Sequence, residues 1–373
     1  HMAHIHQPRK VILKSFCVDF DETLTSQDTT SAVLFESVVS AAKTDVEKDD
    51  KRAQWANLST WYGVEASAWR DREIQKAEPE PKLRSTCAAE RSAALLLFAA
   101  RMSEFEKAAV GRVSESGVLA GVTRQQLEAD ARAWSSDQER HGGGAPRFKR
   151  GAREAMELAG LVFGRAPTIV SINWSRDVVR GALEGACIPF AAICCNDLSF
   201  SPHSRESTGV VCDDAVNSML GKVQVQRNLV AELGGGKVAE KGSEGQRAAE
   251  VGEAATTEAR SDHHPKKKTP NRFAEQSLSV FVGDSVTDLA AMVEADVGVL
   301  IGGSESVKRT CSAFGVEVRP LSAATERVAQ GGVPHVAAGD ELKIYEAADG
   351  WSDVSRFLRA LQRGQELLGP SNS

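Results

Sequence analysis

A short apolar run near the start of the chain ends in two aspartates and limits what the chain can fold into. Residues 11–25 contain the β-branched and aromatic side chains of a buried strand, and Asp19 and Asp21 stand at its end. In an open parallel sheet, the carboxyl end of a strand is where ligands bind. Carboxylates gathered there are typical Mg²⁺ ligands. The same residues also fit a strand followed by a solvated acidic turn, so this run alone does not establish a metal site.

A second apolar run with an acidic end lies far downstream. Residues 277–292 form an apolar strand that ends in Gly283 and Asp284, and Asp288 follows four residues later. On a helix, that spacing puts Asp284 and Asp288 on the same side. A Gly-Asp pair alone is weak evidence, but Gly-Asp-x-x-x-Asp between an apolar strand and a helix indicates a second acidic strand end more strongly.

The sequence between and around these runs predicts an α/β core with a helical insertion. From residue 151 onward, short strands alternate with helices, which indicates a doubly wound parallel sheet. Residues 26–150 lack strand signals and have apolar residues at helical spacing. Residues 234–272 are rich in Gly, Ala, Glu and Lys without apolar periodicity, so we expect a disordered insertion there. We expect residues 196–211 to form an antiparallel excursion or a loop.

Ser171, at the end of a short strand, and Lys222, at the start of a helix, lie between the two acidic strand ends. In this order, the four segments resemble the four motifs of the haloacid-dehalogenase (HAD) superfamily of phosphatases. The resemblance implies an α/β fold with a HAD-like Rossmannoid core, a parallel sheet and an inserted all-helical cap. The core would comprise residues 1–25 and 151–373, and the cap residues 26–150.

The resemblance also implies roles for the two aspartates of the first run. Asp19 would be the nucleophile that forms an aspartyl-phosphate. Asp21 would protonate the leaving oxygen and later activate water, as a general acid and base. Asp19, the main-chain carbonyl of Asp21 and Asp284 would hold Mg²⁺, which keeps the carboxylates from repelling a phosphate dianion.

The remaining site residues follow from the same resemblance, with alternatives that the sequence leaves open. Ser171 would donate a hydrogen bond to a phosphoryl oxygen, and Lys222 would neutralise the transferring group. Asp288 would hold a metal-bound water or Lys222. We expect Asn173 and Trp174, in the loop after Ser171, as substrate contacts. Competitors on spacing alone are Ser175, which suits a helix N-cap better, and Lys237 and Lys241, which lie in the Gly-rich segment.

Over nearly all of its length, the chain is also similar to the HAD half of the plant bifunctional thiamine-monophosphate phosphatases. Thiamine monophosphate as substrate is implied by this similarity, not by the motifs. Four cap aromatics could stack its rings and three glutamates could balance its positive charge: Trp55, Trp61, Tyr62 and Trp69, and Glu104, Glu106 and Glu115. Aromatic residues at helical spacing are more often core than pocket, so none of them is assigned to catalysis.

Three alternatives stay open. The substrate could be another small phosphomonoester, such as phosphoserine, phosphocholine or pyridoxal phosphate. The chain could transfer the phosphoryl group to a sugar instead of water. It could also be a binding protein that retains the scaffold without catalysis. Intact Asp19, Asp21, Lys222 and Asp284 argue against the last of these.

Composition limits the partners and the cellular compartment that we expect for this chain. The formal net charge of −6 predicts no nucleic-acid surface, and no apolar run reaches the ~20 residues of a membrane span. Seven cysteines without metal-ligand spacing indicate free thiols in a reducing compartment. We therefore expect a cytoplasmic enzyme that acts on a small phosphate ester. An organellar location stays open, because the opening His1-Met2 resembles a cloning remnant and a targeting peptide could have been removed.

Overall fold

A parallel sheet forms the centre of the computed structural model, which describes residues 11–77, 87–141, 146–212, 216, 218–233, 276–332, 334 and 341–367. Within these residues, the sheet has seven strands, and every neighbouring pair is parallel. Their order across the sheet is β4 (Ala192–Cys194), β3 (Thr168–Val170), β1 (Val11–Val18), β7 (Gln276–Gly283), β8 (Val297–Ile301), β10 (Leu342–Ala347) and β9 (Val316–Pro320).

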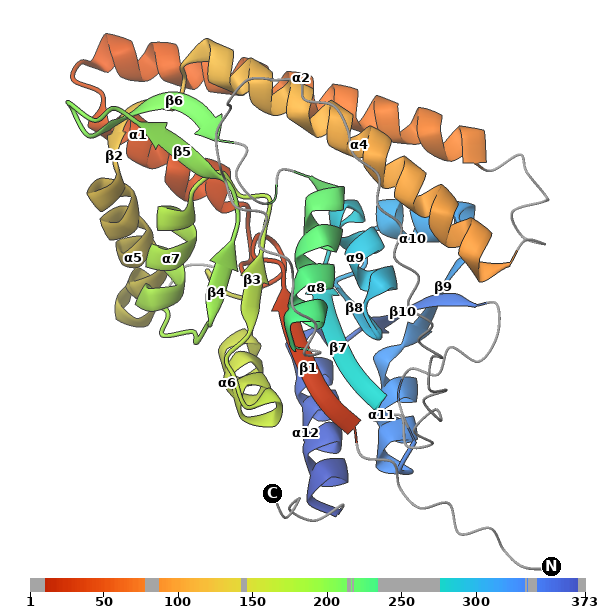
Figure 1. The fold of residues 1–373 in the computed structure, drawn as a ribbon. Coiled ribbons are helices and arrows are strands. Elements are labelled where there is room, and N and C mark those ends of the chain that lie inside the picture. The colour runs from red at the N-terminus through yellow and green to blue at the C-terminus, as the bar shows by residue number, and fades with distance from the viewer. Residues whose placement is uncertain are drawn as a thin grey trace, which may run out of the picture.

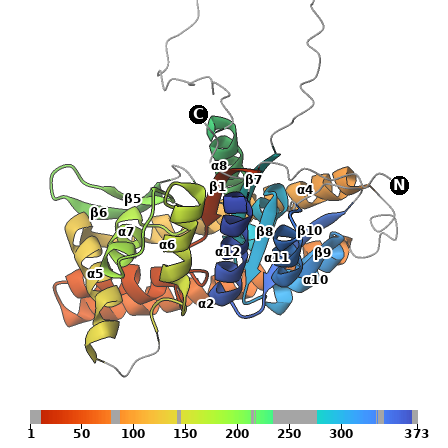
Figure 2. The same ribbon diagram turned by 90° about the horizontal axis from the view of Figure 1, so that it is seen from below.

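Helices cover both faces of this sheet (Figure 2). One face carries α6 (Ala152–Phe163), α11 (Leu321–Ala329) and α12 (Trp351–Leu367), and the other carries α8 (Met219–Leu233), α9 (Leu289–Glu294) and α10 (Glu305–Ala313). Side chains of β1 alternate between the two layers, as a strand requires. Phe16 and Val18 join one hydrophobic cluster, whereas Cys17 joins the other. The predicted α/β core is therefore confirmed.

The strand order reverses at β1, and this reversal positions the site. From β1 the chain proceeds to β3 and β4 on one side, and then to β7 and the remaining strands on the other. In register, Val18 lies beside Ile169 of β3 and Val282 of β7. The residues that follow these three strands therefore meet at one edge of the sheet. Such a switch point is where open α/β sheets bind ligands.

Helices from the segment 26–150 lie across this edge of the sheet (Figure 1). A short π-helical turn, η1 (Thr30–Phe35), leads into α1 (Glu36–Ala41), and two long helices follow, α2 (Asp45–Ala77) and α4 (Ala88–Ser116). The ends of β1, β3 and β7 point towards α2 and α4. These two helices therefore supply the wall that faces the carboxyl ends of the strands.

The expectation that residues 26–150 are wholly helical is wrong at one strand. β2 (Ala120–Thr123) pairs antiparallel with β6 (Glu206–Cys212), which pairs antiparallel with β5 (Asp197–Phe200). Of the two possibilities left open for residues 196–211, an antiparallel excursion or a loop, the strands β5 and β6 confirm the excursion. Sequence periodicity missed β2, because the strand is four residues long and its partner lies more than 80 residues away.

After β2 the chain returns to the core as a helix that packs closely on its neighbour. α5 (Arg124–His141) lies against α7 (Arg176–Gly185). A Cβ atom on Gly181 would come within 2.4 Å of the Glu128 carbonyl oxygen, and one on Gly185 within 2.6 Å of the Arg132 carbonyl oxygen. Only glycine allows the two helix backbones to approach this closely.

Two further expectations concern the remainder of the chain and its surface. The insertion expected at 234–272 lies outside the described residues. None of the described helices combines the length and the apolar character that crossing a bilayer requires.

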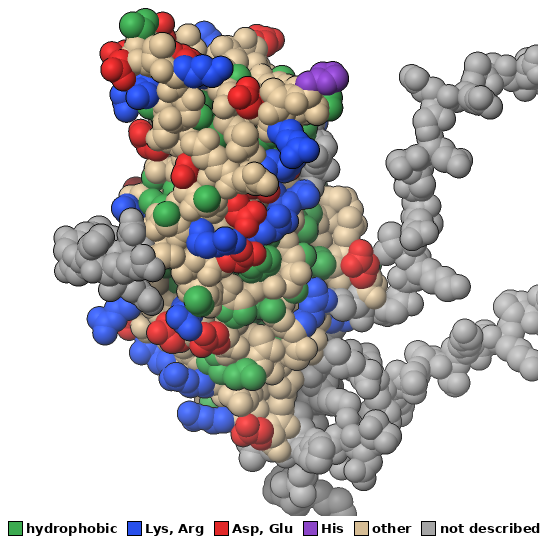
Figure 3. Space-filling view, turned by 90° about the vertical axis from the view of Figure 1, so that its left-hand side faces the viewer, with side chains coloured by type: hydrophobic (Ala, Val, Ile, Leu, Met, Phe, Trp, Pro, Cys, Tyr) green, Lys and Arg blue, Asp and Glu red, His purple; other side chains and the backbone are tan. Residues whose placement is uncertain are grey.

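On the face seen in Figure 3, lysine and arginine side chains are interspersed with aspartate and glutamate, in keeping with the modest net charge. The seven cysteines are all free, as expected.

Candidate active site

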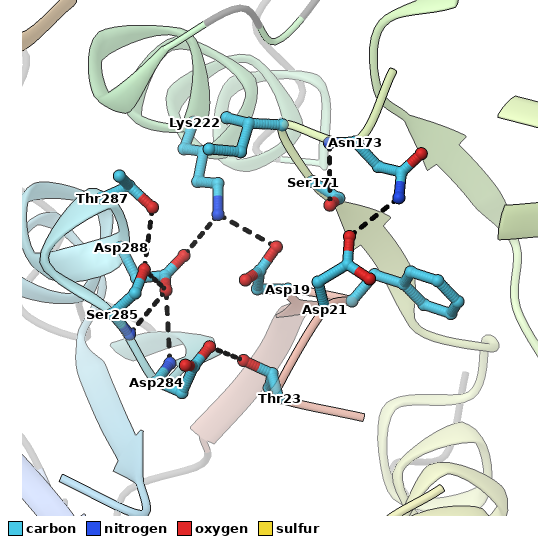
Figure 4. A network of polar contacts seen from close by, with 12 residues as sticks. Asp19, Asp21, Thr23, Ser171, Asn173, Lys222, Asp284, Ser285, Thr287 and Asp288 are labelled. Carbon is cyan, nitrogen blue, oxygen red and sulfur yellow. Dashed lines mark hydrogen bonds and ion pairs between the residues drawn. The ribbon is translucent and has the colours of Figure 1, made fainter. Parts of the chain in front are cut away.

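Asp19 lies directly beyond the end of β1, at the floor of a cavity (Figure 4). Its main-chain N–H donates to the Val282 carbonyl at 2.9 Å, so the pairing of β1 with β7 continues as far as this residue. The residue is 5% exposed. The sheet therefore holds the Asp19 backbone and presents its carboxylate to the cavity.

Lys222 is fully buried and reaches Asp19 from the first turn of α8. Its Nζ atom lies 2.9 Å from Asp19 Oδ1 and 2.6 Å from Asp288 Oδ1. Burial alone would lower the pKa of Lys222, but the two carboxylates outweigh burial and hold the pKa above its usual range. The residue therefore places a permanent positive charge beside Asp19. Its predicted competitors Lys237 and Lys241 lie outside the described residues.

Hydrogen bonds hold both carboxylate oxygens of Asp288. Its Oδ2 atom accepts hydrogen bonds from the Asp284 N–H at 3.2 Å, and from the N–H and hydroxyl of Ser285 at 3.0 and 2.8 Å. Its Oδ1 atom accepts from Lys222. Of the two partners expected for Asp288, a metal-bound water or Lys222, the structure places Lys222 beside it.

Asp284 follows β7 and is oriented from the first loop of the chain. The Thr23 hydroxyl donates to Asp284 Oδ1 at 2.6 Å. The Thr23 carbonyl in turn accepts from the indole N–H of Trp351, a buried residue of α12, at 2.9 Å. Sequence reasoning did not assign Thr23 to the site. The signal that could have found it is its place two residues after Asp21, in the same strand-end run.

The charges at the cavity floor are unbalanced in a way that fits a metal cation. Carboxylate oxygens of Asp19, Asp284 and Asp288 all lie within 4.8 Å of one another, and one ammonium, that of Lys222, faces them. Burial, with Asp288 nearby, raises the pKa of Asp19 well above its usual range and that of Asp284 to about 7. Further positive charge would reverse both shifts, and carboxylate oxygens suit Mg²⁺. The residues present therefore fit the expected metal.

Asp21 has a different environment from Asp19. Its Oδ1 atom accepts from the Thr29 N–H at 2.8 Å and hydroxyl at 2.6 Å, and its Oδ2 atom accepts from Asn173 Nδ2 at 2.8 Å. Burial and the nearby Asp28 raise the pKa of Asp21 to about 6. A carboxyl with a pKa close to neutral can both give and take a proton, so the position suits a general acid and base.

Asn173 has a role that the sequence did not suggest. It was expected to contact substrate, but it is 2% exposed and does not line the cavity. Its amide holds the Asp21 carboxylate and also donates to the Thr29 hydroxyl at 2.9 Å. Thr29 was missed altogether, because no local pattern indicates that its side chain reaches back eight residues to Asp21.

Ser171 and Trp174 lie where the sequence predicts them. Ser171 follows β3 and lines the cavity, and its hydroxyl oxygen accepts from the Asn173 N–H at 3.2 Å, which leaves the hydroxyl proton for another acceptor. Trp174 also lines the cavity. The competitor Ser175 is instead the N-cap of α7, where its hydroxyl accepts from the Val178 N–H.

The cavity above these residues has a volume of about 500 Å³, which lies within the usual range for small-molecule sites. Its far wall consists of one face of α2 and one face of α4. Among the residues weighed as ring or charge partners, Trp55, Trp61, Tyr62 and Glu106 line it. Trp69, Glu104 and Glu115 do not, and the two glutamates are exposed.

Comparisons with known proteins give one relative by sequence. No family model matches the chain. It is 27% identical over 222 residues to the bifunctional TH2 protein, mitochondrial, of Arabidopsis thaliana, and the match covers 59% of this chain and 28% of that protein. The chain thus spans less than a third of the length of this relative.

Solved structures resemble the fold at a low level. A Bordetella pertussis protein of unknown function has a TM-score of 0.45 at 14% identity, over 82% of this chain and 96% of that chain. Phosphoserine phosphatase in its apo form has a TM-score of 0.36 at 14% identity, over 80% and 90%. Cytosolic 5′-nucleotidase IIIB bound to cytidine has 0.41 at 12% identity, over 95% and 87%. At such scores the likeness adds nothing to the topology and side chains described above.

Proposed function

We infer that this chain is a phosphatase of the HAD superfamily, which hydrolyses a small phosphomonoester through an aspartyl-phosphate on Asp19. One observation carries the inference. The Asp19 carboxylate, beside the Lys222 ammonium at 2.9 Å, lies at the floor of a cavity that Asp21, Ser171 and Asp284 also line. Nucleophile, acid–base group and phosphate-binding groups thus meet at the switch point of a parallel sheet.

The first half of the reaction uses Asp19 and Asp21. An Asp19 oxygen attacks phosphorus, the bond from phosphorus to the ester oxygen breaks, and Asp21 gives its proton to the leaving alkoxide. Lys222 and the Ser171 hydroxyl stabilise the negative charge on the phosphoryl oxygens. A metal held by Asp19, the Asp21 carbonyl and Asp284 would supply further positive charge at these oxygens.

The second half returns the enzyme to its starting state. Asp21, now a carboxylate, takes a proton from water as the water oxygen attacks phosphorus. The acyl-phosphate bond breaks, inorganic phosphate leaves, and Asp19 is regenerated. We propose that α2 and α4 act as the cap over this chemistry, with the core formed by 1–25 and 151–373, and that their opening admits the substrate.

We propose thiamine monophosphate as the substrate. The similarity of the motifs and cap to plant thiamine-monophosphate phosphatases supports it. So do Trp55, Trp61 and Tyr62, whose aromatic side chains line the cavity that would hold the substrate's two rings. We further propose that the enzyme acts in thiamine biosynthesis. The compartment stays a prediction, cytoplasmic or organellar; the Arabidopsis relative is mitochondrial by name.

A panel of phosphomonoesters assayed with Mg²⁺ tests the proposal. We expect thiamine monophosphate to give the highest kcat/KM, above phosphoserine, phosphocholine and pyridoxal phosphate, with D19N as the inactive control. A middle rank for thiamine monophosphate would remove the substrate assignment and leave the phosphatase. Label from ¹⁸O-water in the released phosphate distinguishes hydrolysis from transfer to another alcohol.

A further inference from the structure

A buried carboxylate with no cation partner faces the cavity from α4. Glu106 is 6% exposed, lines the cavity, and accepts a hydrogen bond from the Tyr62 hydroxyl of α2 at 2.8 Å. Within the described part of the chain, no lysine or arginine forms an ion pair with it. The nearest influences are more distant, from Lys222 and Arg70.

Leaving an unpaired carboxylate buried is costly. A buried charge is normally paired or neutralised, and a half-satisfied one destabilises the fold. The Tyr62 hydroxyl donates a hydrogen bond to one of the two Glu106 carboxylate oxygens, Oε1. Burial raises the pKa of Glu106, which reflects the missing counter-charge. A positively charged ligand in the cavity would supply that charge.

The other charged residues of the cavity also favour a positively charged ligand. Its titratable lining residues comprise six carboxylates and one guanidinium: Asp19, Asp21, Glu22, Asp28, Glu106, Asp284 and Arg70. Asp19, Asp21 and Asp284 serve the phosphoryl transfer and the proposed metal. In the rest of the lining, Glu22, Asp28 and Glu106 outnumber Arg70, the one basic residue that the described part of the chain places there. This part of the cavity is therefore net negative, although it must accept the non-phosphate part of a substrate.

Aromatic rings surround the same space. Trp55 stacks on Phe35 with a ring separation of 4.7 Å, and its ring meets that of Trp174 edge-on at 6.2 Å. These contacts fix the Trp55 ring between the cap and the core. Trp61 and Tyr62 line the cavity from the next turns of α2. The Arg112 guanidinium already lies over the Trp61 ring at 4.3 Å, so Trp55 is the better candidate for the ligand. Fixed aromatic faces together with a buried carboxylate are the combination that binds organic cations.

We propose that Glu106, oriented by Tyr62, is the specificity-determining residue that selects phosphate esters of cationic alcohols. The positive charge of the leaving group, whether a thiazolium or a quaternary ammonium, would lie among the aromatic rings beside the Glu106 carboxylate. This inference rests on the proposed function for its catalytic readout, but it concerns binding of the leaving group and can be measured without turnover.

An isosteric pair of substrates isolates the charge. Phosphocholine and 3,3-dimethylbutyl phosphate have the same shape and differ by one positive charge. The wild-type protein should prefer phosphocholine, and in E106Q the ratio of the two kcat/KM values should fall on the order of tenfold to a hundredfold. Gln keeps the shape and can still accept from Tyr62, so the fold is preserved. Y62F should lower the ratio less, because the carboxylate stays.

Glu104 provides the matched control. It lies on the same helix, is exposed, and does not line the cavity. E104Q removes the same formal charge from the protein and should retain the wild-type ratio. An equal fall of the ratio in E104Q and E106Q would show that only the overall charge matters, and it would overturn the proposal.

Binding of the dephosphorylated alcohols separates this inference from the proposed function. Thiamine and choline should bind the wild-type protein in a calorimeter and bind E106Q on the order of tenfold or more weakly. Binding that depends on Glu106 in a protein without phosphatase activity would sink the proposed function and support the inference. Hydrolysis of both isosteres at a ratio that E106Q leaves unchanged would overturn the inference and leave the phosphatase standing.

Discussion

The Thr23 hydroxyl donates a 2.6 Å hydrogen bond to Asp284 Oδ1 and so joins two strand ends that are 261 residues apart in the sequence. The bond orients one carboxylate of the proposed metal site from the loop that carries the proposed nucleophile. The Thr23 main chain is itself held by the buried indole of Trp351. The loop, the metal site and the C-terminal helix therefore form one connected unit.

Loss of this hydrogen bond should weaken metal binding more than folding. In T23V the shape of the side chain is kept and the donor is lost. Because such outer partners set the orientation of a ligand, we expect the Mg²⁺ concentration for half-maximal activity to rise on the order of tenfold to a hundredfold. T23S retains a hydroxyl and should stay close to wild type. An unchanged Mg²⁺ dependence in T23V would show that Asp284 needs no such support.

Replacement of Asp19 by Asn should abolish turnover without unfolding the protein. The amide is no nucleophile towards phosphorus. It also removes one of the two buried carboxylates that pair with the Lys222 ammonium, so the excess negative charge at the floor is relieved. We expect the free energy of unfolding in metal-free buffer to equal or exceed that of wild type, by denaturant titration. Appreciable residual activity would contradict the role of Asp19.

Lys222 should matter to the fold as much as to the chemistry. In K222M, Asp19 and Asp288 lose the one cation that pairs with them among the described residues, and breaking such a buried pair costs about 3–5 kcal/mol of unfolding free energy. The double variant K222M/D288N removes one of the stranded charges and should regain part of that loss. If the two variants were equally stable, the ion pair with Asp288 would not be what stabilises this region.

Metal-free protein should lose stability as the pH rises from about 4 to about 7. The pKa of Asp284 is about 7 in the folded chain, above its usual value near 3.8, so between these values the folded state binds more protons than the unfolded state. Asp21, with a pKa of about 6, adds to the effect. Melting temperatures measured across this range should fall with pH. D284N should flatten the curve.

Added Mg²⁺ should reverse this trend, because it binds the ionised carboxylates. Its stabilising effect should therefore be largest above pH 7 and smallest near pH 5. A metal effect that does not change with pH would argue against Asp284 as a ligand. Calorimetric scans with and without Mg²⁺ at both pH values provide the measurement.

Gly283 should not tolerate even a methyl group. A Cβ atom there would lie 2.4 Å from Asp288 Cγ and 2.7 Å from its Oδ2, so Asp288 would have to move away from Lys222. We expect G283A to lower both activity and stability, the latter by a few kcal/mol. G111A, in the middle of α4 with open space around it, is the matched control and should be neutral or slightly stabilising. Denaturant titrations of both variants give the comparison.

Placement of the candidate site could be predicted from sequence wherever it depends on strand ends. Asp19, Ser171 and Asp284 each follow a strand, and parallel strands bring their carboxyl ends to the same edge. Lys222 had to be inferred from motif order, because nothing local shows that a helix lysine is buried. The hydrogen bonds of Thr29 and Asn173 to Asp21 could not be predicted from the sequence, because they form only when loops from different strands meet.

The cap could be predicted in outline only. Helical periodicity revealed the stretches that form α2 and α4. The buried face is extensive in α4, with eight buried residues, whereas α2 has three. Periodicity did not reveal β2, whose identity as a strand comes from pairing with β6. It also left open which aromatic residues line the cavity: Trp61 does and Trp69 does not, although both lie on the same helix.

The pairing of β2 with β6 limits which segments of such a chain can be replaced by recombination. β2 belongs to the segment before the second motif, whereas β6 belongs to the segment after it, so the small sheet is built from both. Excision of residues 26–150 would leave β6 with an unpaired edge, which is a template for aggregation. A recombination event that grafts a new cap onto this core would therefore have to supply a strand that pairs with β6 in place of β2. Substrate range in such proteins should change by substitutions along α2 and α4 more readily than by replacement of the whole cap.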